Sequence, residues 1–141
     1  MKNYCYIISS HDKTRTYNGY TNNLTRRLRQ HCGEISGGAR STQCRDDWEY
    51  IAILTSESLE FTKNIALSCE WHIRYPTNKK PRPRIFNGYE GRLKSLEFAL
   101  HNIQNKYTTI SFVLYIPNDI YQFFQFLQNE KLSIKLLSEL L

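Results

Sequence analysis

Two runs of β-branched and aromatic residues near the start of the chain predict a hairpin. They cover residues 4–9 and 14–21, and a short polar stretch separates them. Such a pair predicts two antiparallel strands. Gly19 interrupts the second run, which is typical of a bulge or of a close approach to the backbone. Apolar and polar positions also alternate over residues 48–54, which predicts a third strand.

Three stretches of the chain have helical periodicity. Asn22 or Asn23 is a candidate cap for a helix that runs to about residue 32. A second apolar stripe of helical spacing leads up to Pro76, where that helix must stop. Residues 92–104 are again amphipathic and predict a third helix.

The last third of the chain continues with a short strand-like run at residues 110–116 and two helical stretches at about 119–127 and 134–141. These elements predict an α/β (α+β) fold, with a three-stranded, mainly antiparallel sheet flanked by helices. We expect a principal domain over residues 1–90 and a helical C-terminal extension packed on its core over residues 91–141. The extension is expected to cover the core, with a partner or dimer surface as the alternative.

The length of 141 residues suits one domain with a real core, because 40% of the residues are hydrophobic. A net charge of +6 and a pI near 9.2 favour a polyanionic partner. Positive charge is concentrated between residues 74 and 94, where Glu90 is the one acidic residue. A solvated loop kept soluble by its charge is the alternative. The candidate DNA-binding residues are Arg26, Arg40, Arg74, Lys79, Lys80, Arg82 and Arg84.

Several protein classes are disfavoured. No apolar run reaches the roughly 18 residues that a membrane span needs, and the first residues lack the layout of a signal peptide. We therefore expect an intracellular protein of the nucleus or cytoplasm that is not secreted and has no membrane partner. The four cysteines show no C-x-x-C pair, which favours reduced and mostly buried thiols.

The first predicted helix separates two kinds of arginine. At about 100° per residue, with Leu24 at zero, His31 falls near −20° and Arg27 near −60°, at the edge of the apolar face. Arg26 and Arg29 point well away. An arginine and a histidine that face the protein body need an anionic or hydrogen-bonding counterpart. A structural salt bridge is one alternative.

A carboxylate and two phenols are also predicted to face the protein body, where each needs a partner. On the helix before Pro76, at about 100° per residue, Glu70 falls near +40° from Ala66 and so lies on the apolar face. It either pairs with an arginine or binds a cation. Tyr6 and Tyr17 lie across the predicted hairpin and can project to one side. Ordinary aromatic packing is the alternative for both phenols.

The order and spacing of these residues resemble a known family. Tyr4-Cys5-Tyr6 and Tyr17-Asn18-Gly19 resemble the paired tripeptides of GIY-YIG nucleases, although Tyr4 replaces the family's glycine and Cys5 and Asn18 replace its isoleucines. Residues 21–31 and 66–71 resemble two helices of that family. Within that family, these motifs most resemble those of the eukaryotic nucleases that cut flaps and Holliday junctions. The Cys/His-rich zinc module of those nucleases is not found in this sequence.

The resemblance implies a catalytic set and a metal ion. The set is Tyr6, Tyr17, Arg27, His31 and Glu70. Glu70 would be the protein ligand of Mg²⁺ or Mn²⁺, and Arg27 would grip the scissile phosphate. Tyr6 would be the general base, with Tyr17 or His31 accepting or relaying its proton. Because a free phenol titrates near pH 10, this role requires Arg27 or the metal to lower the pKa of Tyr6.

The implied function is a divalent-metal-dependent DNA endonuclease that selects branched or flapped duplexes for DNA repair or recombination. A protein scaffold or a second copy of the chain would be its partner. Trp48, Trp71 or Tyr89 could stack on unpaired bases. Two alternatives are a site-specific homing or restriction-type nuclease and a DNA-binding module without catalysis.

Overall fold

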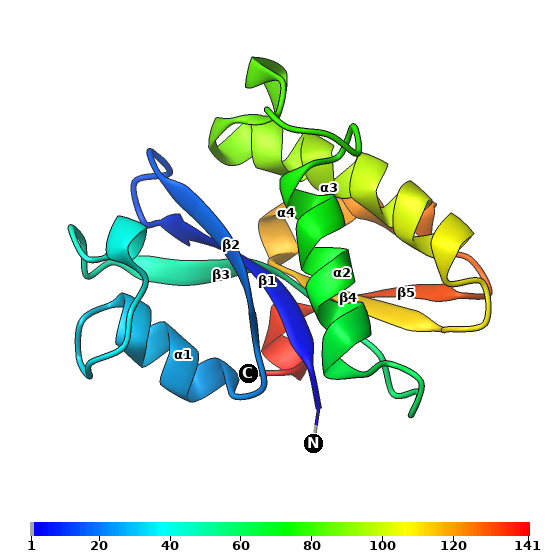
Figure 1. Ribbon diagram of the computed structural model, residues 1–141, viewed down its shortest axis with the longest axis horizontal. Helices are drawn as coiled ribbons and strands as arrows, with labels where there is room; N and C mark the ends of the chain where they lie inside the picture. The colour runs from blue at the N-terminus through cyan, green and yellow to red at the C-terminus, as the bar shows by residue number, and fades with distance from the viewer. Residues whose placement is uncertain (1) are drawn as a thin grey trace.

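The structure is a computed structural model that describes residues 2–141, which form one mixed sheet with helices packed on it (Figure 1). The sheet has five strands in the order β2-β1-β3-β4-β5. The strands are β1 (Tyr4–Ser10), β2 (Thr16–Thr21), β3 (Trp48–Thr55), β4 (Phe112–Ile116) and β5 (Leu132–Leu136). The α-helices are α1 (Leu24–His31), α2 (Lys63–Arg74), α3 (Gly88–Lys106) and α4 (Asn118–Phe124). Short 3-10 helices are η1 (Arg40–Thr42), η2 (Arg84–Phe86), η3 (Gln125–Leu127) and η4 (Leu137–Glu139).

The predicted hairpin and third strand are confirmed. Strand β1 pairs antiparallel with β2 on one side and with β3 on the other. Tyr6 of β1 lies opposite Gly19 of β2. Strand β2 is therefore an edge of the sheet, and β1 is held between two neighbours.

The prediction of a three-stranded sheet is wrong, because two further strands join it. Strand β4 pairs antiparallel with β3, and β5 pairs parallel with β4. Residues 134–141, predicted as a helix, form the end of β5 and then η4. Leu132 and Ile134 are buried, whereas Ser133 and Lys135 are exposed, so the period of two typical of a strand prevails here. The α+β class is confirmed.

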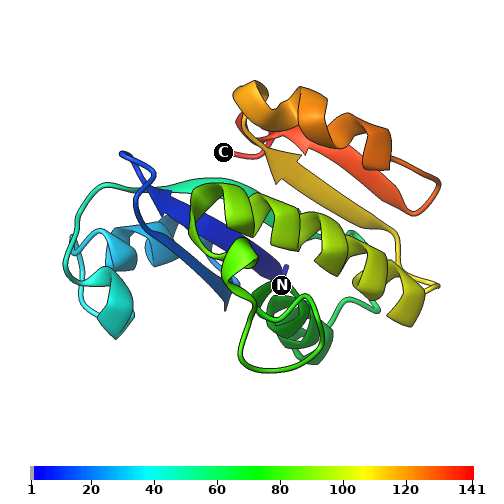
Figure 2. The ribbon, with the colours of Figure 1, turned by 90° about the horizontal axis from the view of Figure 1, so that it is seen from above.

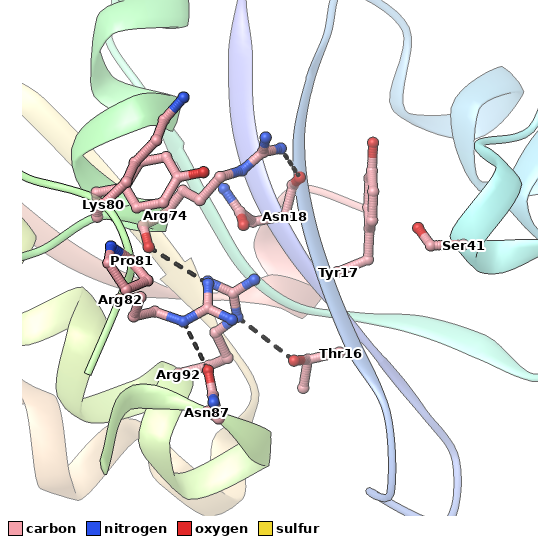
Figure 3. A pocket seen from close by; sticks show the side chains of 11 residues that line it. Thr16, Tyr17, Asn18, Ser41, Arg74, Lys80, Pro81, Arg82, Asn87 and Arg92 are labelled. Carbon is pink, nitrogen blue, oxygen red and sulfur yellow. Dashed lines mark hydrogen bonds between the residues drawn. The ribbon is translucent and has the colours of Figure 1, made fainter. Parts of the chain in front are cut away.

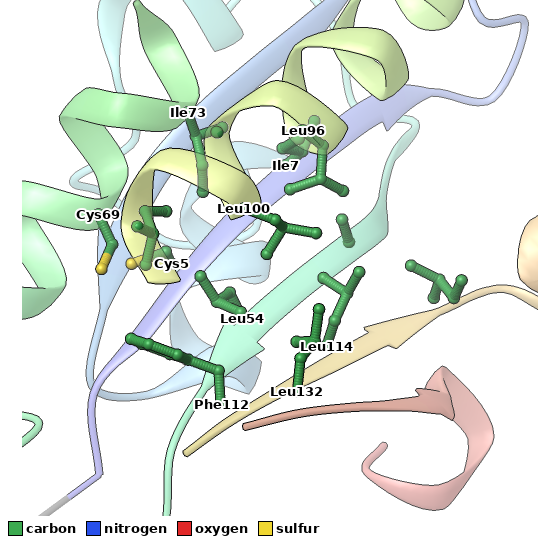
Figure 4. Close-up of a cluster of buried hydrophobic side chains, with 14 of the residues drawn as sticks. Cys5, Ile7, Leu54, Cys69, Ile73, Leu96, Leu100, Phe112, Leu114 and Leu132 are labelled. Atoms are coloured by element: carbon green, nitrogen blue, oxygen red, sulfur yellow. The ribbon is translucent and has the colours of Figure 1, made fainter. Parts of the chain in front are cut away.

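The alternation of side chains along β1 divides the core between the two faces of the sheet. Cys5 and Ile7 belong to the larger apolar cluster, together with residues of α2 and α3 (Figure 4). Tyr6 and Ile8 belong to a smaller cluster that includes Leu24 of α1. Figure 2 shows α3 lying along the sheet. Tyr6 is consequently directed towards α1.

Two general expectations about the chain can be compared with the structure. Within residues 2–141 no helix is both long and apolar enough to cross a bilayer. All four cysteines are free thiols. Cys5 and Cys69 are buried, Cys32 is half-buried and Cys44 is exposed.

Candidate active site

The ring of Tyr6 lies across the edge strand at Gly19. Tyr6 is only 1% exposed. A Cβ atom placed on Gly19 would lie 2.7 Å from the Tyr6 hydroxyl oxygen and 2.9 Å from its Cζ. A Cβ atom does not come that close to other heavy atoms in real proteins, so Gly19 is glycine because the Tyr6 ring needs its space. Of the two sequence interpretations, close approach is therefore confirmed for this position.

Helix α1 carries two of the candidate residues on its inner side. It begins after Asn23, whose side chain accepts a hydrogen bond from the Arg26 backbone N–H at 3.0 Å. His31 is buried and Arg27 is half-buried, whereas Arg26 and Arg29 are exposed. The orientation predicted from the helical period is confirmed.

A chain of hydrogen bonds fixes the protonation of His31. Thr42 Oγ1 donates its proton to the carbonyl oxygen of Ala39 at 2.9 Å, so it can only accept from His31 Nδ1, which lies 2.9 Å away. Nδ1 therefore carries the proton, and Nε2 of a neutral His31 is an acceptor. The Tyr6 hydroxyl lies 2.6 Å from Nε2 and must donate to it. Thr42 thus leaves the unprotonated Nε2, with its lone pair, facing the phenol.

Arg27 is fixed beside the same phenol. Its Nε donates to the Tyr6 hydroxyl oxygen at 3.1 Å. Its Nη1 donates to Gln30 Oε1 at 3.0 Å and to the Gly37 carbonyl at 2.9 Å. Three bonds to groups on β1, α1 and the following loop hold the guanidinium in one place without a carboxylate partner. Among residues 2–141 the predicted salt-bridge alternative for Arg27 is therefore absent.

Tyr17 completes this group from the edge strand. Its ring centroid lies 5.0 Å from that of His31 and 6.5 Å from that of Tyr6. Tyr17 is half-buried and also lines a cavity on the surface. Four of the five predicted catalytic residues therefore meet in one place.

The pKa values decide which groups carry protons. Burial raises the pKa of Tyr6 to about 12, although the hydrogen bond and charge of Arg27 act in the opposite direction. Arg27 alone does not give this phenol the lowered pKa that a general-base role requires, because burial outweighs the guanidinium. Burial and then the charge of Arg27 lower the pKa of His31 to about 4. At neutral pH the phenol is protonated and the imidazole is neutral.

Glu70 is the fifth predicted residue and is held by different partners. Its Oε1 accepts from Arg74 Nη2 at 2.6 Å and from Asn18 Nδ2 at 3.3 Å. Burial raises the pKa of its carboxyl group against the opposing charges of Arg74 and Arg92. The arginine pairing considered for this carboxylate is confirmed. In the described chain Glu70 has no hydrogen bond to Tyr6, Tyr17, Arg27 or His31.

The edge strand explains how Glu70 still belongs to the site. Tyr17 and Asn18 are successive residues of β2 and point to opposite faces of the sheet. Tyr17 contacts His31 on the side of α1, and Asn18 binds Glu70 on the side of α2. The charge of Glu70 also contributes to the raised pKa of Tyr6, after burial and the opposing effect of Arg27. The candidate site therefore extends over both faces of one strand that has no outer neighbour.

The predicted DNA-binding residues fall into two groups. Arg74 and Arg82 are half-buried and line the cavity beside Tyr17, together with exposed Lys80 (Figure 3). The others are exposed and lie outside the lining of that cavity: Arg26, Arg40, Lys79 and Arg84.

Of the residues suggested for base stacking, Trp48 cannot take that role. It is 4% exposed, and its indole N–H donates to the Thr42 carbonyl at 3.0 Å. This bond fixes the short helix η1 against β3.

Three residues that the sequence did not single out as site residues complete this region. Thr42, which sets the tautomer of His31, carries no periodic signal because the 3-10 helix η1 that contains it is only three residues long. Asn18 appeared only as a departure from a motif, yet it binds Glu70. Arg92 is 6% exposed and lies four residues before buried Leu96 on α3. That spacing, an arginine in phase with an apolar stripe, could have identified it.

Comparison with known proteins assigns the class. The GIY-YIG catalytic domain matches residues 2–83, which is more than half of the chain. The matched region contains all five residues of the candidate site. The chain belongs to the GIY-YIG family.

Within that family, the chain is similar in sequence to structure-specific endonuclease subunits. The chain is 40% identical over 78 residues to the structure-specific endonuclease subunit SLX1 homolog of Giardia intestinalis, covering 55% of this chain and 21% of that protein. It is 37% identical over 89 residues to the SLX1 homolog of Brugia malayi, covering 60% and 25%. Against the structure-specific endonuclease subunit slx1 of Aspergillus niger it is 37% identical over 84 residues, covering 56% and 19%. The matched region therefore spans a quarter or less of each relative.

Proposed function

We propose that this chain is a divalent-metal-dependent DNA endonuclease that hydrolyses phosphodiester bonds and selects flaps, forks or Holliday junctions. The observation that carries the proposal is the hydrogen-bond chain from Thr42 through His31 to Tyr6, with Arg27 bound to the same phenol. Hydrolysis of a phosphodiester needs a water that loses a proton and a cation that meets the growing negative charge. This cluster offers both functions.

The residues near Glu70 suit a hard divalent cation such as Mg²⁺ or Mn²⁺. Glu70 Oε2 accepts no hydrogen bond from the described residues, and Asn18 Oδ1 is a buried acceptor without a partner. Residues 2–141 hold no cluster of three or more His, Cys, Asp or Glu side chains able to bind a metal. Few protein oxygens are typical of magnesium, which keeps most of its water ligands. A bound cation would supply Lewis-acid stabilisation of phosphate charge.

Arg27 would bind the scissile phosphate. Three hydrogen bonds hold its guanidinium in position before substrate arrives, so little side-chain entropy is lost on binding. No carboxylate in the described chain competes for it. The guanidinium can therefore meet the negative charge that builds on the phosphate oxygens.

The phenol and imidazole would relay the proton of the attacking water. The Tyr6 oxygen donates to His31 and accepts from Arg27, which leaves one lone pair for a water. As that water loses a proton to Tyr6, the original phenol proton passes to His31 Nε2, and the hydroxide attacks phosphorus while the alkoxide leaves. The relay avoids a free phenolate, which a pKa of about 12 makes rare at neutral pH.

A phosphate beside Arg27 also makes His31 a better acceptor. The charge of Arg27 is one of the two causes that lower the pKa of His31, after burial. A phosphate anion paired with Arg27 would offset that charge, so the pKa of His31 would rise on substrate binding. The base would thus gain strength when DNA is in place.

Selection by DNA shape is supported by the relatives, which are named structure-specific endonuclease subunits. The word subunit in those names also supports a protein scaffold as partner, with a homodimer as the other arrangement.

The test is a panel of labelled flap, fork, four-way junction and plain duplex DNA of one sequence, incubated with Mg²⁺ and then with EDTA. Glu70→Gln and Arg27→Ala are the site variants. The control is Arg29→Gln, since Arg29 is exposed and paired with Glu34 away from the site. We expect cutting of branched DNA with Mg²⁺ alone, loss by orders of magnitude in both site variants, and normal cutting by the control.

Three results would overturn the proposal. Binding without cutting on every substrate would identify a module without catalysis. Cuts at one sequence in plain duplex would identify a site-specific nuclease. Normal cutting by Glu70→Gln would remove the metal-binding role assigned to that carboxylate.

A further inference from the structure

A cavity of about 660 Å³ opens beside the candidate site and is lined by cationic side chains. Its walls come from β2, the loop before β3, the end of α2, the arm between α2 and α3, and α3 itself (Figure 3). Tyr17 and Asn18 of β2 belong to the cavity and to the candidate site at once. A ligand in the cavity would therefore lie next to the catalytic residues.

The charge in this cavity is unbalanced. Arg74, Arg82, Arg92 and Lys80 line it, and no aspartate or glutamate among residues 2–141 does. In the described part of the chain one ion pair involves these four residues, between Arg74 and Glu70 on α2. Cations gathered in a partly buried place without anions repel one another and lose hydration. A cluster of cations with a structural role would include carboxylates that neutralise it. A cavity lined by cations without carboxylates is instead typical of a site that binds an anion.

Arg92 shows the imbalance most clearly. The residue is 6% exposed, and its Nη1 is buried without a hydrogen-bond partner among residues 2–141. Its Nε makes one long bond of 3.4 Å to Thr16 Oγ1. Burial, then the charges of Arg82 and Arg74, lower the pKa of Arg92 to about 9. A buried charged donor without an acceptor is costly, and a bound anion would remove that cost.

The guanidinium of Arg82 is also held in a position that suits a bound anion. Its Nε donates to Asn87 Oδ1 at 2.8 Å, and its Nη1 donates to the Arg74 carbonyl at 3.3 Å. These bonds fix the guanidinium while Nη2 makes no hydrogen bond to the described chain. Arg82 and Arg92 thus offer free N–H groups from two separate segments. Guanidinium groups arranged in this way suit a tetrahedral oxyanion, because each can donate two parallel hydrogen bonds.

We propose that Arg74, Arg82 and Arg92 form a phosphate-binding pocket, which holds a DNA phosphate next to the scissile one and separate from Arg27. The identity of the ligand as DNA rests on the proposed function, whereas binding of a phosphate group does not. A phosphate held there fixes how far the strand extends across β2, and so determines which bond reaches Tyr6. The pocket accepts either an internal phosphodiester or a terminal phosphate.

The experiment measures binding without cleavage, in EDTA. The probes are inorganic phosphate and a short single-stranded oligonucleotide with or without a 5′-phosphate, followed by calorimetry and by thermal shift. Arg92→Met keeps an apolar stem of similar length, and Arg82→Gln, on a partly exposed residue, is a second variant that spares the core. Arg29→Gln is the control. Circular dichroism verifies the fold of each variant.

We expect both pocket variants to bind phosphate and oligonucleotide about 10- to 100-fold more weakly, the size typical of a lost hydrogen bond to a charged group. The control should bind as the native chain does. If removing the 5′-phosphate weakens native binding as much as Arg92→Met does, the pocket holds a strand end. If removal changes nothing, it holds an internal phosphate.

Unchanged binding by both pocket variants, or an equal loss in Arg29→Gln, would overturn the pocket. The outcome is independent of the catalytic proposal. A chain that binds phosphate through Arg92 and cuts no DNA keeps the pocket and loses the nuclease. A chain that cuts branched DNA and binds it equally well without Arg92 keeps the nuclease and loses the pocket.

Discussion

Replacing Gly19 with alanine is the most direct test of how the candidate site is built. The added methyl group would lie 2.7 Å from the Tyr6 hydroxyl oxygen, 2.9 Å from Tyr6 Cζ and 3.1 Å from Tyr17 Cε1. Tyr6 cannot move away freely, since it is 1% exposed and its hydroxyl is bonded to His31 and Arg27. The substitution therefore has to displace the phenol from both partners.

The expected cost follows from these contacts. Overpacking a filled site costs typically about 1–3 kcal/mol, and each lost hydrogen bond of Tyr6 adds about 1 kcal/mol. We expect the free energy of unfolding to fall by about 3–5 kcal/mol when the overpacking and the two lost hydrogen bonds are taken together. Cleavage should fall by about 100-fold, because a reacting group displaced by about 1 Å loses its alignment. Urea unfolding followed by tryptophan fluorescence and single-turnover cleavage measure the two effects.

A double-mutant cycle isolates the cause. Tyr6→Ala empties the space above Gly19, so adding Gly19→Ala to that variant should cost nothing, or should stabilise the strand slightly because glycine is unfavourable in strand interiors. If Gly19→Ala costs the same with and without the Tyr6 ring, within about 0.5 kcal/mol, the close contact is not the reason for glycine at this position.

Three further predictions concern protonation, tautomer and fold. Because the folded pKa of His31 is about 4 and an unfolded histidine titrates near 6.5, the unfolded chain binds more protons between these values. The free energy of unfolding should therefore fall as the pH drops from 6.5 to 4, by up to about 3 kcal/mol, and urea titrations of His31→Gln should show a smaller fall. Thr42→Val should slow cleavage by about 10-fold or more, because His31 loses its fixed tautomer, while Thr42→Ser retains activity; equal rates would contradict this role. Ile134→Ala should lower stability by about 2–4 kcal/mol in urea unfolding, since Ile134 is 3% exposed in β5; a negligible change would contradict burial of this strand.

The first half of the fold could be predicted from local patterns. Residues 4–9 and 48–54 are rich in apolar and aromatic residues because β1 and β3 are buried on both faces of the sheet. Asn is a favoured helix cap, and Asn23 caps α1. Strand β5 could not be predicted in the same way. Its sequence fits a helical period as well as a strand period, and only its pairing with β4 decides between them.

The candidate site was predictable to the extent that it depends on helix geometry. The period of α1 was enough to turn Arg27 and His31 towards the protein body. The actual partners were not predictable, because the contact between His31 and Thr42 joins two segments through a loop without periodicity. The sign of the Tyr6 pKa shift also needed the structure, since burial and Arg27 oppose each other and their balance depends on depth.

The position of β2 at the edge of the sheet limits which changes in length the chain can accept. Tyr17 and Asn18 serve opposite faces, so an insertion or deletion of one residue within Tyr17–Gly19 would reverse both side chains and move the glycine from under the Tyr6 ring. The turn between β1 and β2 has no such constraint, because residues 11–15 lie outside the paired register and are exposed. Among relatives, gaps in alignment should therefore collect in that turn and be absent from the three residues that follow Thr16.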